Sequence, residues 1–262
     1  MSETIPDAFT DPASSAQWSR GGPTLVIGAT WFELAPLLDD LTDERAQEDA
    51  PAWPTVRVGR LAGVPVVITA GGIGKANTAA AIAGVHGAVG IRAVLQLGIG
   101  GAYPGPTGEP PLAPGSVAIA ASEYDLDLGV GVGDQWRGLE SIGFASVATD
   151  PPTYNLIATD PGSTTRAANA TGSPIVPFAT SDSVTSDSVR AAWIARLTGA
   201  RIESMEGAAA AQVCLALDLP FLEIRAVSNE VGVRDKRLWR IHEAIAAAAG
   251  TALTALPSLS AA

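Results

Sequence analysis

The stretch RAVLQLGIGG, residues 92–101, carries the pattern on which the fold assignment rests. Its first part, Arg92 to Leu97, is largely apolar and does not alternate strictly with polar residues, which is typical of a strand buried on both faces. The run Gly98-Ile99-Gly100-Gly101 then predicts a tight turn that ends this strand. Because a strand of this kind needs helices on both sides of its sheet, the stretch indicates an α/β fold.

Short apolar strands alternate with helical segments along the rest of the chain. Strands are predicted at Thr24–Ala29, Trp53–Gly59, Val64–Ala70, Ser116–Ser122, Ile175–Ala179, Ala200–Ser204 and Phe221–Val227. Helices are predicted at Trp31–Leu41, Lys75–Val89, Ser163–Asn169, Asp187–Leu197, Glu206–Leu217 and Leu238–Leu256. The charged segment Thr42–Ala50 predicts a surface connection. This order predicts a three-layer α/β/α sandwich with a mostly parallel or mixed central sheet.

The bulk composition suits one large domain, since the chain has 262 residues and 47% of them are hydrophobic. We expect a single domain over residues 23–262. Residues 1–22 are polar and lack the basic and apolar regions of a signal peptide, so we expect a mobile tail there. No uninterrupted apolar stretch reaches the roughly 20 residues that span a membrane. We therefore expect no membrane contact and a cytoplasmic location.

The formal net charge of −11 argues against a nucleic-acid partner, because phosphate contacts need clustered Lys and Arg. Two glycine-rich segments suggest nucleotide cofactors but do not match their motifs. A P-loop would need glycine in place of Thr69 and Ser or Thr in place of Ala76. A dinucleotide-binding loop would need glycine in place of Tyr103. We therefore expect no cofactor, and we interpret Lys75 as a surface charge.

The sequence also contains no motif for a metal site or for a reactive thiol. His86 and His242 lack the spacing of metal ligands and are interpreted as ordinary helix or surface residues, so no metal site is expected. Cys214 lies in an apolar run and is interpreted as a small buried hydrophobe.

Three segments with polar residues follow or end predicted strands: GATWFE (Gly28–Glu33), SMEGAAAAQ (Ser204–Gln212) and RAVSN (Arg225–Asn229). Since ligands bind beyond the carboxyl ends of parallel strands, we expect these segments to meet at one edge of the sheet. Each has a simpler interpretation on its own. The helix dipole favours a glutamate such as Glu33 or Glu206 in a first turn, and Asn229 is also typical of an ordinary turn.

Taken together, the segments resemble the purine nucleosidases related to 5′-methylthioadenosine/S-adenosylhomocysteine nucleosidase, in the nucleoside phosphorylase superfamily. The shared patterns are G-A-x-x-x-E, G-I-G-K, a glycine-rich turn, M-E-[GA]-A and R-A-[IV]-S-[DN]. They stand here at Gly28–Glu33, Gly72–Lys75, Gly98–Gly101, Met205–Ala208 and Arg225–Asn229. The resemblance spans residues 24–250, and VSNEVGVRDKRLW (Val227–Trp239) is especially similar to the futalosine hydrolases.

This resemblance implies a nucleoside phosphorylase-like fold, a nucleoside substrate and a homo-oligomer, a dimer or higher. It implies that Glu33 activates the attacking water, that Glu206 binds the ribose 2′- and 3′-hydroxyls, and that Met205 packs beneath the sugar. Asn229 stands where the adenosine nucleosidases have aspartate, and joins Glu33 as a catalytic candidate. Further substrate-binding candidates are Ile99, Gly100, Val184, which falls near a base-stacking aromatic of the family, and Arg234.

The residue types also fit cleavage of an N-glycosidic bond. The sugar becomes cationic in the transition state, which two carboxylates stabilise, and one of them can accept the proton of water. The Asn229 amide offers two N–H donors, which match N7 and O6 of hypoxanthine better than N7 and the amino group of adenine. This favours futalosine, whose base is hypoxanthine. Its benzoate needs a cation, for which Arg234 is preferred, although a solvated basic turn is an equal interpretation.

Three alternatives stay open. A phosphorylase would need a phosphate site at the first strand, where Glu33 would repel phosphate. A nucleosidase acting on methylthioadenosine, adenosylhomocysteine or aminofutalosine is disfavoured by Asn229. A non-catalytic nucleoside-binding protein would not need a water-activating base at Glu33. Residues 123–173 carry no functional prediction.

Overall fold

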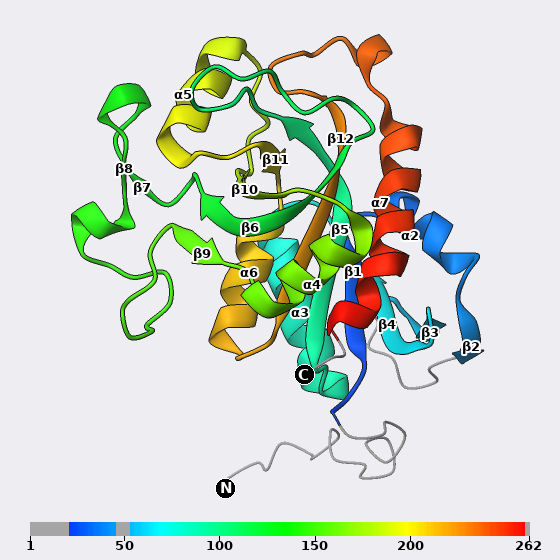
Figure 1. Cartoon of the computed structure of the whole chain (residues 1–262). Coiled ribbons are helices and arrows are strands. Elements are labelled where there is room, and N and C mark those ends of the chain that lie inside the picture. Colours follow the sequence, from blue (N-terminus) through cyan, green and yellow to red (C-terminus); the bar gives the residue numbers. More distant parts are fainter. Residues whose placement is uncertain (1–20, 46–52, 260–262) are drawn as a thin grey trace, which may run out of the picture.

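The computed structural model describes residues 21–45 and 53–259 (Figure 1). The predicted mobile tail thus lies outside the described residues except for Gly21 and Gly22, and so does the predicted connection from residue 46 to residue 50. Strands of the main sheet are β1 (Thr24–Gly28), β2 (Thr42–Arg45), β3 (Val56–Leu61), β4 (Val64–Ala70), β5 (Ala93–Ala102), β6 (Val117–Asp125), β9 (Leu156–Ala158), β10 (Ile175–Thr180), β11 (Ile202–Ser204) and β12 (Phe221–Glu230). The α-helices are α2 (Trp31–Leu38), α3 (Lys75–Val89), α4 (Pro161–Thr171), α5 (Ser188–Thr198), α6 (Gly207–Ala216) and α7 (Ile241–Ala255).

One mixed sheet runs through the molecule in the order β11-β10-β6-β12-β5-β1-β4-β3-β2. Strands β4, β1, β5 and β12 are parallel neighbours, and so are β6, β10 and β11. The two parallel groups meet antiparallel between β12 and β6. The α/β fold with a mixed sheet is therefore confirmed.

The sheet also closes on itself, because β11 pairs with β5 as well as with β10. Strands β5, β12, β6, β10 and β11 thus form a small ring, from which β1, β4, β3 and β2 extend as an open wing. Closure brings the end of β5 against β11, whose last residue leads directly into the predicted Met205-Glu206 segment. This curvature brings predicted site residues that are far apart in sequence close together in space. In a flat sheet, β5 and β11 would not be neighbours.

Helices cover both faces of the sheet (Figure 1). Helices α2, α4 and α7 pack on one face over Val26 and Leu95, and α3 and α6 pack on the other over Leu25 and Ile27. Adjacent residues of β1 thus enter two different cores. This is why the strand sequences show no alternation of polar and apolar residues.

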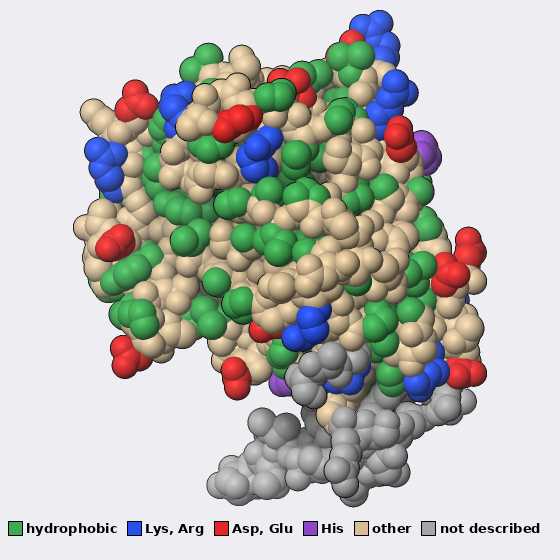
Figure 2. Space-filling model, viewed as in Figure 1, with side chains coloured by type: hydrophobic (Ala, Val, Ile, Leu, Met, Phe, Trp, Pro, Cys, Tyr) green, Lys and Arg blue, Asp and Glu red, His purple; other side chains and the backbone are tan. Residues whose placement is uncertain are grey.

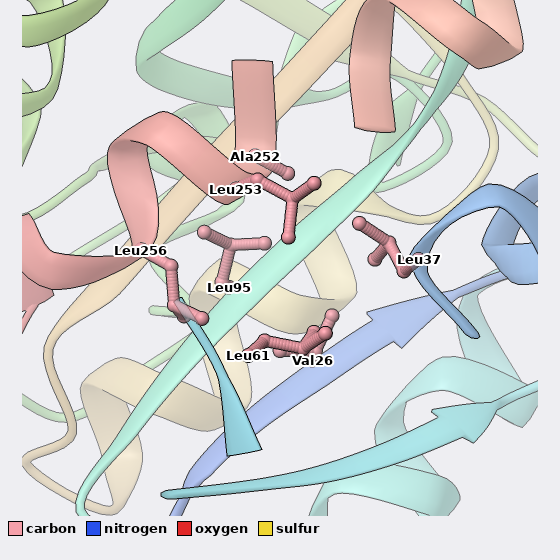
Figure 3. A pocket seen from close by; sticks show the side chains of 7 residues that line it. All are labelled: Val26, Leu37, Leu61, Leu95, Ala252, Leu253 and Leu256. Carbon is pink, nitrogen blue, oxygen red and sulfur yellow. The ribbon is translucent and has the colours of Figure 1, made fainter. Parts of the chain in front are cut away.

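Helix α7 approaches the sheet closely because its inner face is built mainly of alanine. Figure 3 shows Ala252, Leu253 and Leu256 pointing toward Leu95, with Val26, Leu37 and Leu61 around them. The small gap between these side chains is apolar and has no room for a water molecule. Tight packing of this kind holds the strands that carry the site at their ends.

The predicted glycine turn after residue 97 is wrong, because Gly98–Gly101 continue β5 as far as Ala102. Strand β12 pairs with this stretch along its whole length. A Cβ at Gly100 would lie 2.6 Å from the Ile202 side chain and 2.8 Å from the Glu203 carbonyl oxygen. Glycine at this position therefore permits β11 to approach and the ring to close, rather than a chain reversal.

The predicted surface connection at Thr42–Ala50 is wrong for its first four residues, which form the edge strand β2. Its charged composition suits an edge, since charged side chains protect an edge strand from pairing with other chains. Glu44 of β2 forms an ion pair with Arg57 of β3. Tertiary pairing here overrides the polar character that suggested a loop.

Residues 123–173, which the sequence left without a function, contain the end of β6, the hairpin β7 (Gly129–Val130) with β8 (Arg137–Gly138), β9 and α4. On the face seen in Figure 2, Lys and Arg side chains are spread over the surface and form no large patch. Among the described residues, no helix is both long and apolar enough to span a bilayer.

Candidate active site

Glu33 lies at the start of α2, directly after the end of β1. The Thr30 side chain accepts a hydrogen bond from the Glu33 backbone N–H, and the Thr30 N–H donates to Glu33 Oε2 at 3.1 Å, so the two residues form a capping box. Glu33 Oε1 accepts a further bond from the Ile99 N–H of β5 at 3.1 Å. Only 8% of Glu33 is exposed. The helix end thus fixes the carboxylate against the neighbouring strand.

Glu206 lies at the N-terminal end of α6, immediately after β11 and Met205. Its Oε1 accepts a hydrogen bond from the Gly74 N–H at 3.1 Å, and its Oε2 accepts one from Arg225 Nη2 at 3.2 Å. Gly74 has a φ of 90°, which glycine adopts without strain. The G-I-G-K loop therefore serves to present a backbone donor to Glu206.

Arg225 occupies the centre of the site and is 1% exposed. Its Nε donates to Glu223 at 2.8 Å, and its Nη1 donates to the Ile99 carbonyl at 3.3 Å. Burial alone would lower the pKa of Arg225, but the negative charges of Glu223, Glu206 and Glu33 raise it. A guanidinium that remains charged in the core therefore interacts with Glu33, the predicted general base, and with Glu206, the predicted ribose-binding residue.

Glu33 and Arg225 meet above Gly98 of β5. A Cβ at this position would lie 2.7 Å from Glu33 Oε1 and 2.7 Å from Arg225 Nη1. Any side chain here would displace one of the two groups. The first glycine of the Gly98–Gly101 run therefore makes room for the charged side chains of the site.

A second charged cluster borders the site around Lys75, at the start of α3. Lys75 Nζ lies 2.8 Å from both Asp125 and Asp127, and its backbone N–H donates to Asp182 at 3.1 Å. The lysine side chain is 15% exposed, so the interpretation of Lys75 as a surface charge is wrong. The cluster ties the loop that holds Glu206 to residues 181–184, the loop that carries Val184. Val184 itself is 45% exposed there.

The remaining predicted residues lie along the same edge. Met205 is half-buried beside Glu206, and Gly100 accepts a hydrogen bond from the Ser228 hydroxyl through its carbonyl at 3.1 Å. Asn229 stands opposite Gly101 on β5, where its Oδ1 accepts from Ser228 Oγ and its Nδ2 donates to the Glu230 carbonyl. It lines a cavity of about 240 Å³ together with residues 111–114.

Arg234 lies in the exposed loop after β12, with its guanidinium carbon 5.2 Å from the ring centre of Trp239. This loop leads into α7, whose His242 stacks edge-on against Phe32, next to Glu33. The structure thus connects Glu33 to Ile99 directly, and Ile99 to Glu206 through Arg225. Asn229 lies further along β12, opposite Gly101. Arg234 makes none of these contacts.

Sequence reasoning missed Arg225 and Glu223 as site residues. A detectable signal was present, because two opposite charges two residues apart interrupt the apolar run FLEIRAV and must lie on the same face of β12. The identity of their partners was not visible, since Ile99 and Glu206 come from other elements. Two interpretations made from the sequence are confirmed: Cys214 is buried, with its thiol pKa raised by burial, and Glu33 lies in the first turn of its helix.

The sequence family described as the phosphorylase superfamily matches residues 23–259. The chain belongs to this superfamily. It is 38% identical to a futalosine hydrolase of Thermus thermophilus over 72% of this chain and 80% of the relative. A futalosine hydrolase of Streptomyces coelicolor is 36% identical over 69% of this chain and 74% of the relative.

Solved structures share the fold. A 5′-methylthioadenosine/S-adenosylhomocysteine nucleosidase of Colwellia psychrerythraea, solved with adenine, superimposes with a TM-score of 0.76 at 23% identity, covering 92% of this chain and 96% of that one. A futalosine hydrolase of Helicobacter pylori superimposes with a TM-score of 0.69 at 17% identity, covering 91% of this chain and 97% of that one. Both solved structures therefore have the same fold as this chain.

Replacing Lys75 tests the cluster that joins the two loops. We expect Lys75→Met to lower the free energy of unfolding by about 3 kcal/mol at pH 7, because it leaves the buried Asp125 carboxylate without its cation. Burial raises the pKa of Asp127, but hydrogen bonds from Lys75, Asp182 and Ser181 outweigh it and lower that pKa below its ordinary value.

A carboxyl with a lowered pKa stabilises the fold above its unfolded pKa and loses that contribution as the pH falls. The difference between wild type and Lys75→Met should therefore shrink below about pH 4. Urea denaturation of wild type and variant at pH 7 and below about pH 4 measures this difference in the free energy of unfolding. Lys236→Met, in an exposed turn, is the control. Equal losses for the two variants, or a loss that does not depend on pH, would contradict the role of the cluster.

Proposed function

We propose that this chain hydrolyses the N-glycosidic bond of futalosine, releasing hypoxanthine and dehypoxanthine futalosine, in the menaquinone pathway that uses futalosine. The observation that carries the proposal is the pair Glu33 and Glu206, two buried carboxylates held by strand ends around one guanidinium. The named activity of the Thermus and Streptomyces relatives supports the substrate.

In this mechanism Glu33 accepts a proton from water while the water oxygen attacks C1′ of the ribose. The C1′–N9 bond breaks, and hypoxanthine leaves with the bonding electrons and takes up a proton. Oxygens of Glu33 are oriented by N–H donors of Thr30 and Ile99. Its orientation suits a general base, because a fixed carboxylate costs little reorganisation in the transition state.

Glu206 has the complementary role of holding the ribose. Its two oxygens already accept hydrogen bonds from Gly74 and Arg225, and acceptor-only oxygens of this kind also bind the 2′- and 3′-hydroxyls as donors. Its negative charge favours the cationic sugar. Met205, beside it, supplies an apolar floor, and the backbone of Ile99 and Gly100 forms the wall toward Glu33.

Asn229 distinguishes the base in this proposal. Its oxygen accepts a hydrogen bond from the Ser228 hydroxyl, which leaves the amide nitrogen as the group that donates. One N–H donates to the Glu230 carbonyl, so a bound 6-oxopurine would draw the nitrogen from that contact to N7 and O6. Val184 borders the base from the loop after β10, and no aromatic side chain in the loop 181–184 takes part.

Two alternatives keep the same residues. Relatives named as an aminodeoxyfutalosine nucleosidase and a 5′-methylthioadenosine/S-adenosylhomocysteine nucleosidase are 28% and 30% identical, which supports hydrolysis with a 6-aminopurine base. The superfamily name allows a phosphorylase, but the buried Glu33 carboxylate at the end of the first strand would repel a phosphate. The assay below separates all three.

We also propose that the protein acts in the cytoplasm as one domain over residues 23–262 and as a homo-oligomer. The match of the superfamily over residues 23–259 supports the domain extent. Apolar side chains exposed in the segment after β6, including Val132 at 80% and Phe144 at 72%, support a further protein surface covering them.

Replacing the general base tests the reaction itself. In phosphate-free buffer, wild type should release hypoxanthine from futalosine, and Glu33→Gln should lower kcat by on the order of 10³-fold with KM nearly unchanged, since only proton acceptance is lost. Chromatography of released base measures it, and Glu140→Gln on an exposed turn is the control. Release that requires phosphate would identify a phosphorylase, and release only from methylthioadenosine would identify the other nucleosidase.

Replacing Asn229 tests recognition of the base. We expect Asn229→Asp to raise the ratio of kcat/KM for aminofutalosine over futalosine by about tenfold or more, because a protonated carboxyl both donates to N7 and accepts from an amino group. Competition between the two substrates measures the ratio directly. The exposed Asn169→Asp serves as the matched control, and an unchanged ratio would refute the assignment.

Replacing Arg234 tests recognition of the benzoate. We expect Arg234→Ala to raise KM for futalosine about tenfold through loss of a charge-assisted hydrogen bond, with no effect on inosine, which lacks the benzoate. Arg237 is the matched control, since it is 88% exposed and already paired with Asp235. If Arg237→Ala changes KM as much as Arg234→Ala, the loop is only a solvated basic turn.

A further inference from the structure

Beneath Arg225 lie two buried glutamates that the proposed mechanism does not use. Glu123 of β6 and Glu223 of β12 are both 0% exposed. Glu123 Oε2 accepts a hydrogen bond from the Thr180 hydroxyl at 2.7 Å, and Glu223 Oε1 accepts one from Arg225 Nε at 2.8 Å. The other oxygens, Glu123 Oε1 and Glu223 Oε2, have no hydrogen-bond donor among the described residues.

These two remaining oxygens face the same point. A Cβ added to Gly207, the first residue of α6, would overlap with both Glu123 Oε1 and Glu223 Oε2. Glycine at the start of α6 therefore leaves the space in which the two carboxyl groups approach each other. Two ionised carboxylates offer acceptors only, so their contact in the dry interior requires a proton.

The charges around the pair favour one proton and one negative charge. Burial raises the pKa of Glu123 well above its ordinary value, and the charge of Glu223 raises it further, against the opposing effects of Thr180 and Arg225. Arg225 on β12 is the cation that acts on Glu123, and Arg225 itself also interacts with Glu206 at the start of α6 and with Glu33 on α2. From β10 the Thr180 hydroxyl contacts the pair through Glu123, and it also lies 3.1 Å from the Ser204 hydroxyl of β11.

We propose that Glu123 and Glu223 share a single proton and act as positioning residues. They hold the Arg225 guanidinium in the orientation in which it donates to Glu206 and to the Ile99 carbonyl. The proton lies between Glu123 Oε1 and Glu223 Oε2. Glu223 keeps its negative charge toward Arg225 Nε, and this leaves Nη1 and Nη2 for the carbonyl and for Glu206. Neither glutamate touches the substrate. The effect on hydrolysis rests on the proposed function, whereas the shared proton does not.

The shared proton has a direct spectroscopic signature. Infrared spectra of the wild-type protein at pH 8 should show the C=O stretch of a protonated carboxylic acid, shifted by exchange into D₂O, although free glutamate is ionised at this pH. Glu123→Gln and Glu223→Gln should each lose this band, because an amide N–H replaces the proton. Glu203→Gln is the matched control, a nearby buried glutamate that bonds Tyr103 and Thr185 instead, and it should keep the band.

The two variants should differ in kinetics if the pair positions Arg225. In Glu123→Gln the amide N–H donates to Glu223 as the protonated carboxyl did, so the charged Glu223 still positions Arg225 and kcat should stay within about twofold of wild type. Glu223→Gln moves the negative charge to Glu123, away from Nε, and should lower kcat about tenfold with little change in KM, as expected for an oriented group rather than a substrate contact. Equal kcat losses in the two variants would refute the positioning role.

The wild-type spectrum alone tests the shared proton, even if none of the variants folds. Absence of the protonated-carboxyl band in the wild type between pH 6 and pH 8, or its survival in a folded Glu123→Gln protein, would overturn the shared proton. A wild-type band together with no hydrolysis of futalosine would instead refute the proposed function and leave the carboxyl pair standing.

Discussion

The structure depends on one buried cation. Arg225 lies in the middle of β12, in the core, and a guanidinium is tolerated there only if carboxylates and carbonyls satisfy it. Glu223 comes from its own strand, Glu206 from the start of α6 and the Ile99 carbonyl from β5. Each partner belongs to a different element, so the ion network fixes their mutual position more precisely than apolar packing would. Glu33, the predicted general base, and Glu206, the predicted ribose-binding residue, both lie near this group.

The second constraint is space along β5. Three neighbours converge on its glycines: the Glu33 carboxylate, the Arg225 guanidinium and strand β11. Each approach is possible only because a Cβ is missing at Gly98 or Gly100. The glycines of β5 therefore permit both the closed ring of strands and the cluster of charged side chains. Closure of the ring pairs β11 with β5, and Arg225 then bonds both Glu206 and the Ile99 carbonyl.

Local sequence patterns anticipated most elements because their signals are local. The apolar run Phe221–Val227 identified β12, and the Thr30-x-x-Glu33 spacing matches the capping box seen at α2. The errors at Gly98–Gly101 and at Thr42–Arg45 share one cause. Glycines resemble a turn and charged residues resemble a loop until pairing partners from distant parts of the chain are known, and those partners decide the backbone conformation.

The sequence by itself determined the α/β class, the superfamily and the candidates Glu33, Met205, Glu206 and Asn229, because short motifs at strand ends carry that information. Only the tertiary structure decided that the sheet curls into a ring, that Lys75 is an internal cation and that Arg225 joins the carboxylates. The physical reason is the range of the interactions involved. Periodicity and capping act over a few residues, whereas the ion pair of Arg225 with Glu206, and the meeting of Glu123 with Glu223, exist only after strands distant in sequence have been packed together.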